Sequence, residues 1–170
     1  MVFSIESFYQ HASNKTFLRL YLTYIRPHLK YAVAVWDPHQ QGLINSLESV
    51  PRFALKASTR NWKASYDTLI NICNVPTLEE RRHCLKLSIL YQIFNGHISI
   101  PSARVERRSL QRELRNSSSL MLNQRSAVHT NAHQYSFFPH TITLWNQLPS
   151  AVQSCPSLNT FKHSLLSLNV

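Results

Sequence analysis

Arginines recur at helical spacing between residues 104 and 115, and this residue type at this spacing suits the binding of phosphate groups. If the stretch is helical, steps of four, four and three residues place the arginines on one face. Each guanidinium then presents a rigid fork of hydrogen-bond donors. A solvated face with ion pairs to Glu106 and Glu113 is an equally good interpretation. The stripe consists of Arg104, Arg108, Arg112 and Arg115.

A second basic set follows the end of a helical pattern and contains an aromatic residue. The set consists of Arg52, Lys56, Arg60 and Lys63, with Trp62 among them. Aromatic side chains between cations are typical of sites that stack bases and follow a nucleic-acid backbone. Trp62 could equally belong to the hydrophobic core, so the sequence leaves the aromatic part of this hypothesis open.

Metal-dependent nucleotidyl transfer is not indicated, because the carboxylates that it requires are missing. Two divalent cations need clustered oxygen ligands, whereas the only aspartates, Asp37 and Asp67, lie on different expected elements. The single acidic pair, Glu79 and Glu80, stands at the start of a helix, where capping and compensation of the helix dipole explain it. We therefore expect no enzyme activity, no metal and no other cofactor.

Histidine and cysteine patterns also give no indication of catalysis. His129 and His133 are spaced like two ligands on one helical face, but no third ligand follows at a suitable spacing. His83 and Cys84 are neighbours in sequence and would point away from each other on a helix. The three cysteines form no C-x-x-C pair, so we expect free thiols in a reducing compartment.

The overall charge favours a polyanionic partner. Eighteen Lys and Arg against eight Asp and Glu give a formal net charge of +10, and neutralising phosphates with such side chains releases condensed counterions. A basic protein without a specific ligand is the alternative. Glu6 interrupts any apolar signal core, and no stretch reaches the roughly 20 apolar residues that span a bilayer. We expect an intracellular protein, nuclear or cytoplasmic, that is not membrane-embedded.

Apolar periodicity predicts a helical hairpin near the start of the chain. Apolar residues recur at helical spacing over 14–36, where Pro27 should interrupt the helix. A second stripe should pair with this segment in antiparallel fashion, although Pro51 should disturb its last turns. That stripe consists of Leu43, Leu47, Val50 and Ala54.

Capping residues predict where two further helices begin. Ser65 can cap a short helix, and Thr77 with Glu80 has the capping-box pattern for a helix over 77–95. Asn95-Gly96 tolerates the left-handed conformation that ends a helix. The apolar stripe of this helix consists of Leu85, Ile89, Leu90 and Ile93.

These patterns predict a mainly α fold in three segments. Residues 1–100 should form a helical domain, a hairpin followed by a bundle, and residues 101–135, rich in Arg, Ser and Glu, a basic irregular arm or linker. Residues 136–170 should form a small C-terminal helical subdomain, in which Pro149 and Pro156 separate two short helices.

Three stretches of the chain, taken in order, carry a family resemblance. The first covers 20–38, with Tyr-Ile-Arg-Pro-His-Leu-Lys-Tyr at 24–31, and continues over 43–54. The second is Leu-Glu-Glu-Arg-Arg at 78–82 with Tyr-Gln-Ile-Phe-Asn-Gly at 91–96. The third covers 136–149, beginning Ser-Phe-Phe-Pro-His, and 157–162. Together they resemble the region downstream of the polymerase core in non-LTR (LINE-like) retrotransposon reverse transcriptases.

The resemblance spans residues 17–168 and implies a role without catalysis. It implies a thumb-like helical domain over 1–100, but nothing similar to the family's palm, with its metal-binding aspartates, or to an endonuclease is present. The chain would be a C-terminal fragment that binds RNA or DNA through phosphate contacts. Pro51 and His140 depart from the family's pattern, and His140 stands where an arginine is common. A helical module that binds a protein through exposed apolar faces, and a non-functional transposon remnant, are the alternatives.

Overall fold

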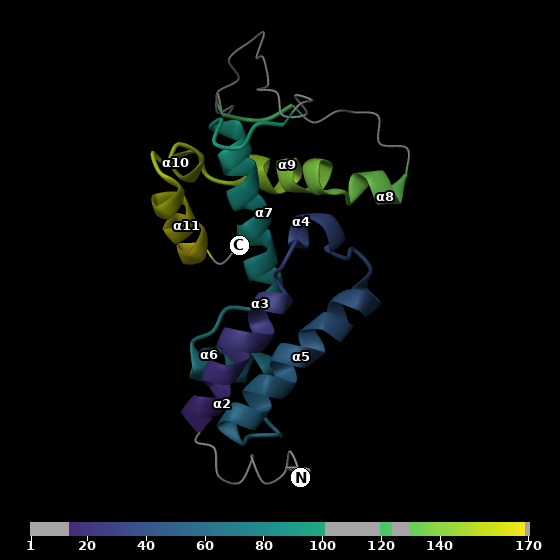
Figure 1. Cartoon of the computed structure of the whole chain (residues 1–170), viewed down its shortest axis with the longest axis vertical. Helices are drawn as coiled ribbons and strands as arrows, with labels where there is room; N and C mark the ends of the chain where they lie inside the picture. The colour runs from purple at the N-terminus through teal and green to yellow at the C-terminus, as the bar shows by residue number, and fades with distance from the viewer. Residues whose placement is uncertain (1–13, 101–119, 124–129, 169–170) are drawn as a thin grey trace. The chain divides into compact units, whose positions relative to one another are not determined.

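The computed structural model describes residues 14–100, 120–123 and 130–168 and shows a mainly α-helical fold (Figure 1). No β-strand occurs within these ranges, which confirms the expected fold class. The chain divides into two compact units, one of residues up to Ala32 with Pro38–Arg81 and one of Val33–Asp37 with Arg82 onward. The expected boundaries at residues 100 and 135 stay predictions. Most of the expected basic arm, 101–135, lies outside the described residues.

The first unit begins with a helix that changes type before a proline. α2 (Asn14–Leu20) continues as a π-helical turn, η1 (Tyr21–Ile25), and then as α3 (Arg26–His28). Pro27 has no N–H to donate, and its ring crowds the carbonyl of the preceding turn. The wider turn accommodates it: the Arg26 N–H donates to the Tyr21 carbonyl, five residues back. Pro27 was expected to kink or restart the helix; the helix changes type directly before it and continues through it to His28.

The second arm of the hairpin is one continuous helix. α5 (Gln41–Thr59) packs against α2, and the two run in opposite directions (Figure 1). Pro51 lies inside α5 and is buried, so the prediction that it would disturb the last turns is wrong. Tertiary packing of the buried face supplies most of the stability of a helix in a protein and here outweighs the lost hydrogen bond. α5 ends at Arg60, whose φ is 55°.

The face that α5 buries differs from the predicted one. Leu43 and Val50 are exposed, at 52% and 36%, and Ala54 alone of the predicted stripe is fully buried. The buried face is turned by roughly 60° at 3.6 residues per turn. It carries small residues that permit close approach to α2 and α6, together with one carboxylate: Glu48, Pro51, Ala54, Leu55, Ala57 and Ser58.

The predicted helix starts at Ser65 and Thr77 are confirmed. The Ser65 hydroxyl accepts a hydrogen bond from the Thr68 N–H, at 3.2 Å, and caps α6 (Tyr66–Cys73). α7 (Leu78–Phe94) opens with a reciprocal pair: the Glu80 N–H donates to the Thr77 hydroxyl at 3.1 Å. The Thr77 N–H donates to the Glu80 carboxylate at 3.0 Å. The first N–H groups of a helix have no partner within the helix. The contact at Ser65 satisfies one such group of α6, and the reciprocal pair of Thr77 and Glu80 satisfies two at the start of α7.

α7 ends as predicted at Asn95-Gly96. The Gly96 N–H donates to the Ile93 carbonyl and the His97 N–H to the Gln92 carbonyl, at 3.1 and 2.8 Å. This pair of bonds closes a helix through a left-handed residue, and Gly96 has φ 73°. The buried face is again shifted: Leu90 is buried, but Leu85, Ile89 and Ile93 are only half-buried, and Leu87 and Tyr91 take their place.

The second unit is built around the aromatic rings of Trp145 and Phe161. The Phe161 ring stacks on Tyr91 with centroids 4.6 Å apart and lies 5.7 Å from Trp145. The Tyr91 hydroxyl donates to the Cys155 carbonyl, and the Trp145 indole N–H to the Leu120 carbonyl, at 2.7 and 3.0 Å. Its helices besides α7 are α4 (Val33–Trp36), α8 (Asn131–Gln134), α9 (Phe137–Gln147), α10 (Ser150–Gln153) and α11 (Leu158–Ser167).

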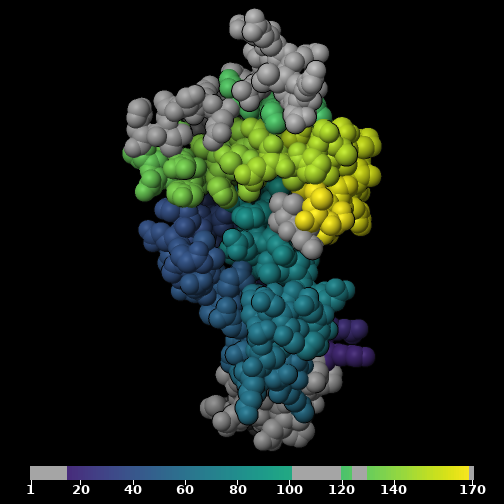
Figure 2. Space-filling view, turned by 180° about the vertical axis from the view of Figure 1, so that it is seen from behind, coloured from purple at the N-terminus to yellow at the C-terminus, as the bar shows by residue number. Residues whose placement is uncertain are grey.

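The C-terminal helices behave as the sequence predicted. α9 and α11 are the two expected short helices, and the extra turn α10 lies between Pro149 and Pro156. Their side chains lie in close contact with one another in the space-filling view, green to yellow (Figure 2). They enclose the apolar cluster that includes Leu87, Leu90 and Ile142, and these buried groups hold the unit together.

The two glycines of the chain allow a matched test of the α7 terminus. Gly96→Ala should lower the free energy of unfolding by about 1–2 kcal/mol, because a Cβ is disfavoured at positive φ. Gly42→Ala should instead raise it by up to about 1 kcal/mol, since Gly42 lies in α5 with nothing near its added Cβ. Urea unfolding followed by circular dichroism measures both changes. Equal signs for the two variants would contradict the assigned terminus.

Candidate nucleic-acid interface

The predicted basic set lies at the C-terminal end of α5 and in the turn that follows it. Arg52 and Lys56 lie on α5, Arg60 ends it, and Lys63 lies in the turn before α6. Arg52, Lys56 and Phe53 fall within an arc of about 100° on the helix, away from its buried face. We call the whole group the basic–aromatic cluster; its members are Arg52, Phe53, Lys56, Arg60, Trp62 and Lys63.

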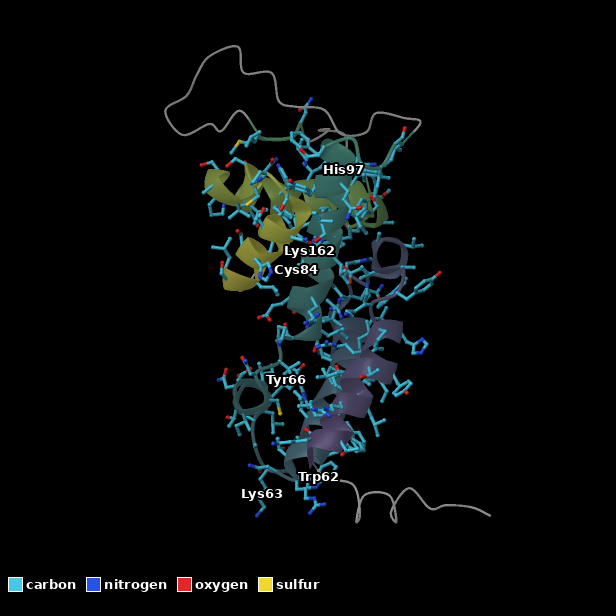
Figure 3. The ribbon with its side chains drawn as sticks, turned by 60° about the vertical axis from the view of Figure 1, so that its left-hand side comes forward. Trp62, Lys63, Tyr66, Cys84, His97 and Lys162 are labelled. Atoms are coloured by element: carbon cyan, nitrogen blue, oxygen red, sulfur yellow. The ribbon has the colours of Figure 1, made fainter. Side chains whose placement is uncertain are left out.

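The structure decides between the two interpretations of Trp62. Its side chain is 54% exposed, and Phe53 is 52% exposed, so neither ring belongs to the core. The two rings meet edge to face, with centroids 5.7 Å apart and planes at 60°. This arrangement leaves ring surface accessible to a ligand while each ring supports the other. Trp62 and Lys63 lie together at one end of the first unit (Figure 3).

Short-range hydrogen bonds fix the turn that carries Trp62. The Thr59 hydroxyl donates to the Leu55 carbonyl at 2.8 Å and accepts from the Asn61 N–H at 3.4 Å. The Asn61 side chain accepts from the Ala64 N–H at 3.1 Å. Asn and Thr side chains commonly stabilise turns in this way. The aromatic side chain therefore projects from a structured turn directly after α5.

Arg52 is held by a partner from the next helix. Its guanidinium lies over the ring of Tyr66, 5.1 Å from the centroid, a favourable cation–π contact. The Tyr66 hydroxyl donates to the Glu48 carboxylate at 2.8 Å. Burial, and then the hydrogen bond to Glu48, raise the pKa of Tyr66, so the phenol stays a donor. A guanidinium that stacks by its face keeps its edge donors for a phosphate.

The cluster carries excess positive charge. Among the residues that the structure describes, no ion pair involves Arg52, Lys56 or Lys63. Lys56 and Arg60 lie at the C-terminus of α5, where cations compensate the helix dipole. That structural role accounts for two of the cations, but it explains neither Lys63 nor the exposed pair of aromatic rings.

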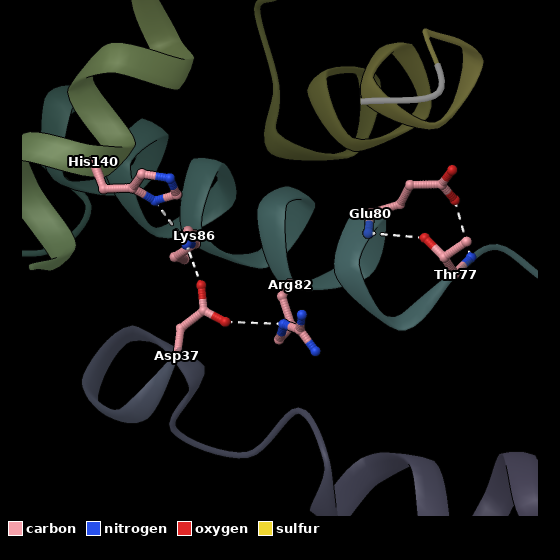
Figure 4. A network of polar contacts seen from close by, with 6 residues as sticks. All are labelled: Asp37, Thr77, Glu80, Arg82, Lys86 and His140. Carbon is pink, nitrogen blue, oxygen red and sulfur yellow. Dashed lines mark hydrogen bonds and ion pairs between the residues drawn. The ribbon is translucent and has the colours of Figure 1, made fainter. Parts of the chain in front are cut away.

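A buried polar network lies in the second unit (Figure 4). Asp37 forms ion pairs with Arg82, at 2.9 Å between Oδ1 and Nε, and with Lys86. The Lys86 ammonium also contacts Nδ1 of His140 at 2.9 Å. Arg82 and Lys86 are each only 2% exposed. Asp37 thus pairs with both buried cations, and breaking a buried ion pair by removing one partner is strongly destabilising.

The pH dependence of stability should carry the signature of His140. Burial, and then the nearby Lys86 and His83, lower the pKa of His140 from 6.5 to about 4. The unfolded chain therefore takes up the proton first as the pH falls. Stability that is present above pH 6.5 should be lost as the pH approaches 4. Urea unfolding across this range should show a shallower decline for His140→Asn than for the parent.

An exposed histidine supplies the control for this measurement. His133 lies on α8 and is exposed, so His133→Asn should keep the parent's pH profile. A profile for His140→Asn that matches the parent's would contradict the assigned burial. The half-buried position of His140 against Lys86 also gives it an internal contact in place of the phosphate contact that an arginine would offer.

The structure places part of the predicted site and adds residues that the sequence did not indicate. Arg104, Arg108, Arg112 and Arg115 lie outside the described residues, as does His129. Phe53 was missed because it stands off the stripe that the periodicity favoured. Its position beside Arg52, three residues before Lys56, was the available signal. Asp37, which the sequence placed on a different element from Asp67, meets partners 45 and 49 residues away in sequence.

Two negative findings concern the described part of the chain. No group of three His, Cys, Asp or Glu side chains there is arranged to hold a metal ion. No helix there is long and apolar enough to cross a membrane.

Comparison with protein-family models, with curated proteins and with solved structures gave no match. The resemblance to retrotransposon reverse transcriptases therefore stays an expectation from the sequence motifs, and a function has to be argued from the residues themselves.

Proposed function

We propose that this chain binds single-stranded RNA or DNA through the basic–aromatic cluster and performs no catalysis. The observation that carries the proposal is the exposed edge-to-face pair of Phe53 and Trp62, flanked by Arg52, Lys56 and Lys63. Stacking on aromatic rings is possible for every base, and cations beside the rings neutralise the backbone. The binding would thus have little dependence on base sequence.

Single strands fit the cluster better than a duplex does. Bases within a duplex already stack on each other and offer no free face, whereas an unpaired base can lie on an exposed ring. The flanking cations are suited to phosphates, whose contacts carry no sequence information. The arginine stripe Arg104, Arg108, Arg112 and Arg115 would add a second set of phosphate contacts under the same proposal.

The ancestry that we propose is the C-terminal region of a non-LTR retrotransposon reverse transcriptase. The ordered motifs at 20–54, 78–96 and 136–162 support it. The helical hairpin of α2 and α5 fits a thumb-like domain. A role beside a polymerase core, holding template or nascent strand, agrees with binding that follows a backbone.

Tryptophan fluorescence tests the proposed stacking directly. Trp62 is exposed, whereas Trp145 is buried and Trp36 half-buried, so a stacked base should quench mainly Trp62. Titration with an oligothymidylate of about 12 nucleotides should quench the parent. The quenching should largely disappear in Trp62→Phe, which can still stack, while anisotropy of a labelled oligonucleotide still reports binding.

A truncated side chain completes this test. Trp62→Ala should weaken binding by about 1–3 kcal/mol, the usual loss for one stacked base. Tyr24→Ala, which removes an aromatic ring that is 66% exposed elsewhere in the same unit, should leave the affinity unchanged. Full quenching in Trp62→Phe, or no binding by the parent at low salt, would overturn the proposal.

Binding to another protein is the second candidate function. Tyr24, Tyr31 and Leu43 are exposed, at 66%, 80% and 52%, and exposed apolar groups mark many interaction surfaces. The same titration separates the two functions: a chain that binds only proteins would show neither quenching nor a salt-dependent anisotropy change with the oligonucleotide.

A further inference from the structure

Three cations interact electrostatically in the first unit, from α3, the turn after it and the first turn of α7. Arg26 lies on α3, Lys30 in the turn after it, and Arg81 on α7. Burial, and then the nearby Arg81, lower the pKa of both Arg26 and Lys30. The three positive charges therefore lie close enough to repel one another. We call them the Arg26–Lys30–Arg81 group.

Among the described residues, the group has no partner in an acidic ion pair. Within the described ranges, no Asp or Glu carboxylate forms an ion pair with any of its three members. The nearest acidic residue in sequence, Glu80, directs its carboxylate to the Thr77 N–H in the capping box. Like charges without a counterion destabilise a folded protein, so the presence of three such cations close together requires an explanation.

One nitrogen of each guanidinium group, in Arg26 and in Arg81, also lacks a hydrogen-bond acceptor. The Nε atoms of Arg26 and Arg81 are buried and have no hydrogen-bond partner in the structure. Most buried polar atoms in folded proteins have a partner, and a bound ion or water is one way in which such an atom is satisfied. Both side chains are only half-buried overall, so an anion from solution can reach the group.

We infer that Arg26, Lys30 and Arg81 bind a phosphate group between α3 and the first turn of α7. A phosphate monoester carries about −1.5 to −2 charges at neutral pH, which balances this group better than the single charge of a carboxylate. Its oxygens point in several directions and can accept from donors on two helices. Guanidinium groups bind such oxygens through paired hydrogen bonds.

The buried Tyr21 lies beside the group. Its phenol interacts electrostatically with Arg26 and Arg81, and burial raises its pKa to about 12. Tyr21 is 2% exposed, so this neighbour of the group belongs to the interior of the first unit. Charge-assisted hydrogen bonds are stronger where water is excluded. The site consists of other residues than the basic–aromatic cluster, and the inference does not depend on the function proposed for that cluster.

Binding of inorganic phosphate to the full chain is the first arm of the test. At equal ionic strength and pH, phosphate should raise Tm above its value in chloride, because a ligand of the folded state stabilises it. The ³¹P resonance of inorganic phosphate should shift or broaden with added protein. Arg81→Gln and Lys30→Gln should each weaken this binding about tenfold or more.

A control separates the site from general electrostatics. Arg19→Gln removes one exposed cation from α2 in the same unit and should leave the phosphate response unchanged. In chloride alone, Arg81→Gln and Lys30→Gln should raise Tm, since they relieve repulsion. A fall in Tm in both salts, with no difference in phosphate response from Arg19→Gln, would assign the cations a purely structural role and overturn the inference.

The second arm identifies the source of the phosphate group. A single-stranded oligonucleotide is titrated in place of inorganic phosphate, with the same variants and the same control. A tenfold loss confined to the oligonucleotide would support the inference with a backbone phosphate as the ligand, and a loss with inorganic phosphate would support it with a free phosphate. If neither the oligonucleotide nor inorganic phosphate bound more weakly to the variants, the inference would be refuted. If Arg81→Gln fails to fold, Lys30→Gln alone decides the outcome.

Discussion

Replacing Asp37 by alanine should lower the free energy of unfolding by about 3–5 kcal/mol. Asp37 is the carboxylate that pairs with both Arg82 and Lys86, and these two side chains are only 2% exposed. Its removal takes an ion-pair partner from two positive charges in a low-dielectric interior, and His140, which lies against Lys86, carries no negative charge to replace it. Native domains are stable by only about 5–15 kcal/mol, so the variant should lose a large share of its stability.

Matched variants separate the network from a general effect of removing an acid. Asp67 is exposed in the first turn of α6, and Asp67→Ala should cost less than about 1 kcal/mol. Replacing the whole network, with Asp37→Leu, Arg82→Met and Lys86→Leu together, should return the stability close to that of the parent. Urea unfolding measures all three. Equal losses for Asp37→Ala and Asp67→Ala would contradict the described network.

Local chemistry made the helix ends predictable. Ser65, the pair Thr77 and Glu80, and Gly96 each act on backbone groups within a few residues. A capping hydroxyl or a left-handed glycine depends on its own neighbours more than on the rest of the fold. The effect of a proline is less local. The helix changes type directly before Pro27, whereas α5 continues past Pro51 because tertiary packing stabilises it there.

The orientation of the helices could not be predicted from apolar spacing alone. The periodicity of α5 favoured Leu43 and Val50, yet the helix buries small residues such as Ala54 and Ser58 against α2 and α6. Close approach between helices rewards small side chains, and large ones are then displaced to the surface. Because the buried face of α5 is turned in this way, Phe53 is exposed and its ring contacts that of Trp62.

Long-range polar contacts were beyond the reach of sequence patterns. Lys86 lies 49 residues from Asp37 and 54 from His140, and nothing in their spacing links them. The group of Arg26, Lys30 and Arg81 has the same character, because α3 and α7 are distant in sequence. The proximity of the basic set to Trp62 was predictable, since these residues fall within 52–63, on the last turns of α5 and in the segment that follows it.

Removing the cations of the cluster should have the largest effect on binding. The triple replacement Arg52→Gln, Lys56→Gln and Lys63→Gln takes away three groups that no ion pair engages within the described residues. Affinity for a single strand at low salt should fall steeply and almost independently of base sequence, because phosphate contacts carry no sequence information. The matched control replaces three exposed cations elsewhere, Lys15, Arg19 and Lys162, by glutamine.

The salt dependence of oligonucleotide binding tests the proposed function most directly. For a single strand, the slope of log affinity against log salt concentration is about −0.7 per phosphate neutralised. The parent should therefore show a slope of about −3 or steeper, from the four cations of the basic–aromatic cluster. The triple variant should flatten this slope by about two units, and the matched control by much less. A triple variant with the parent's slope, or a control that flattens the slope equally, would contradict the account.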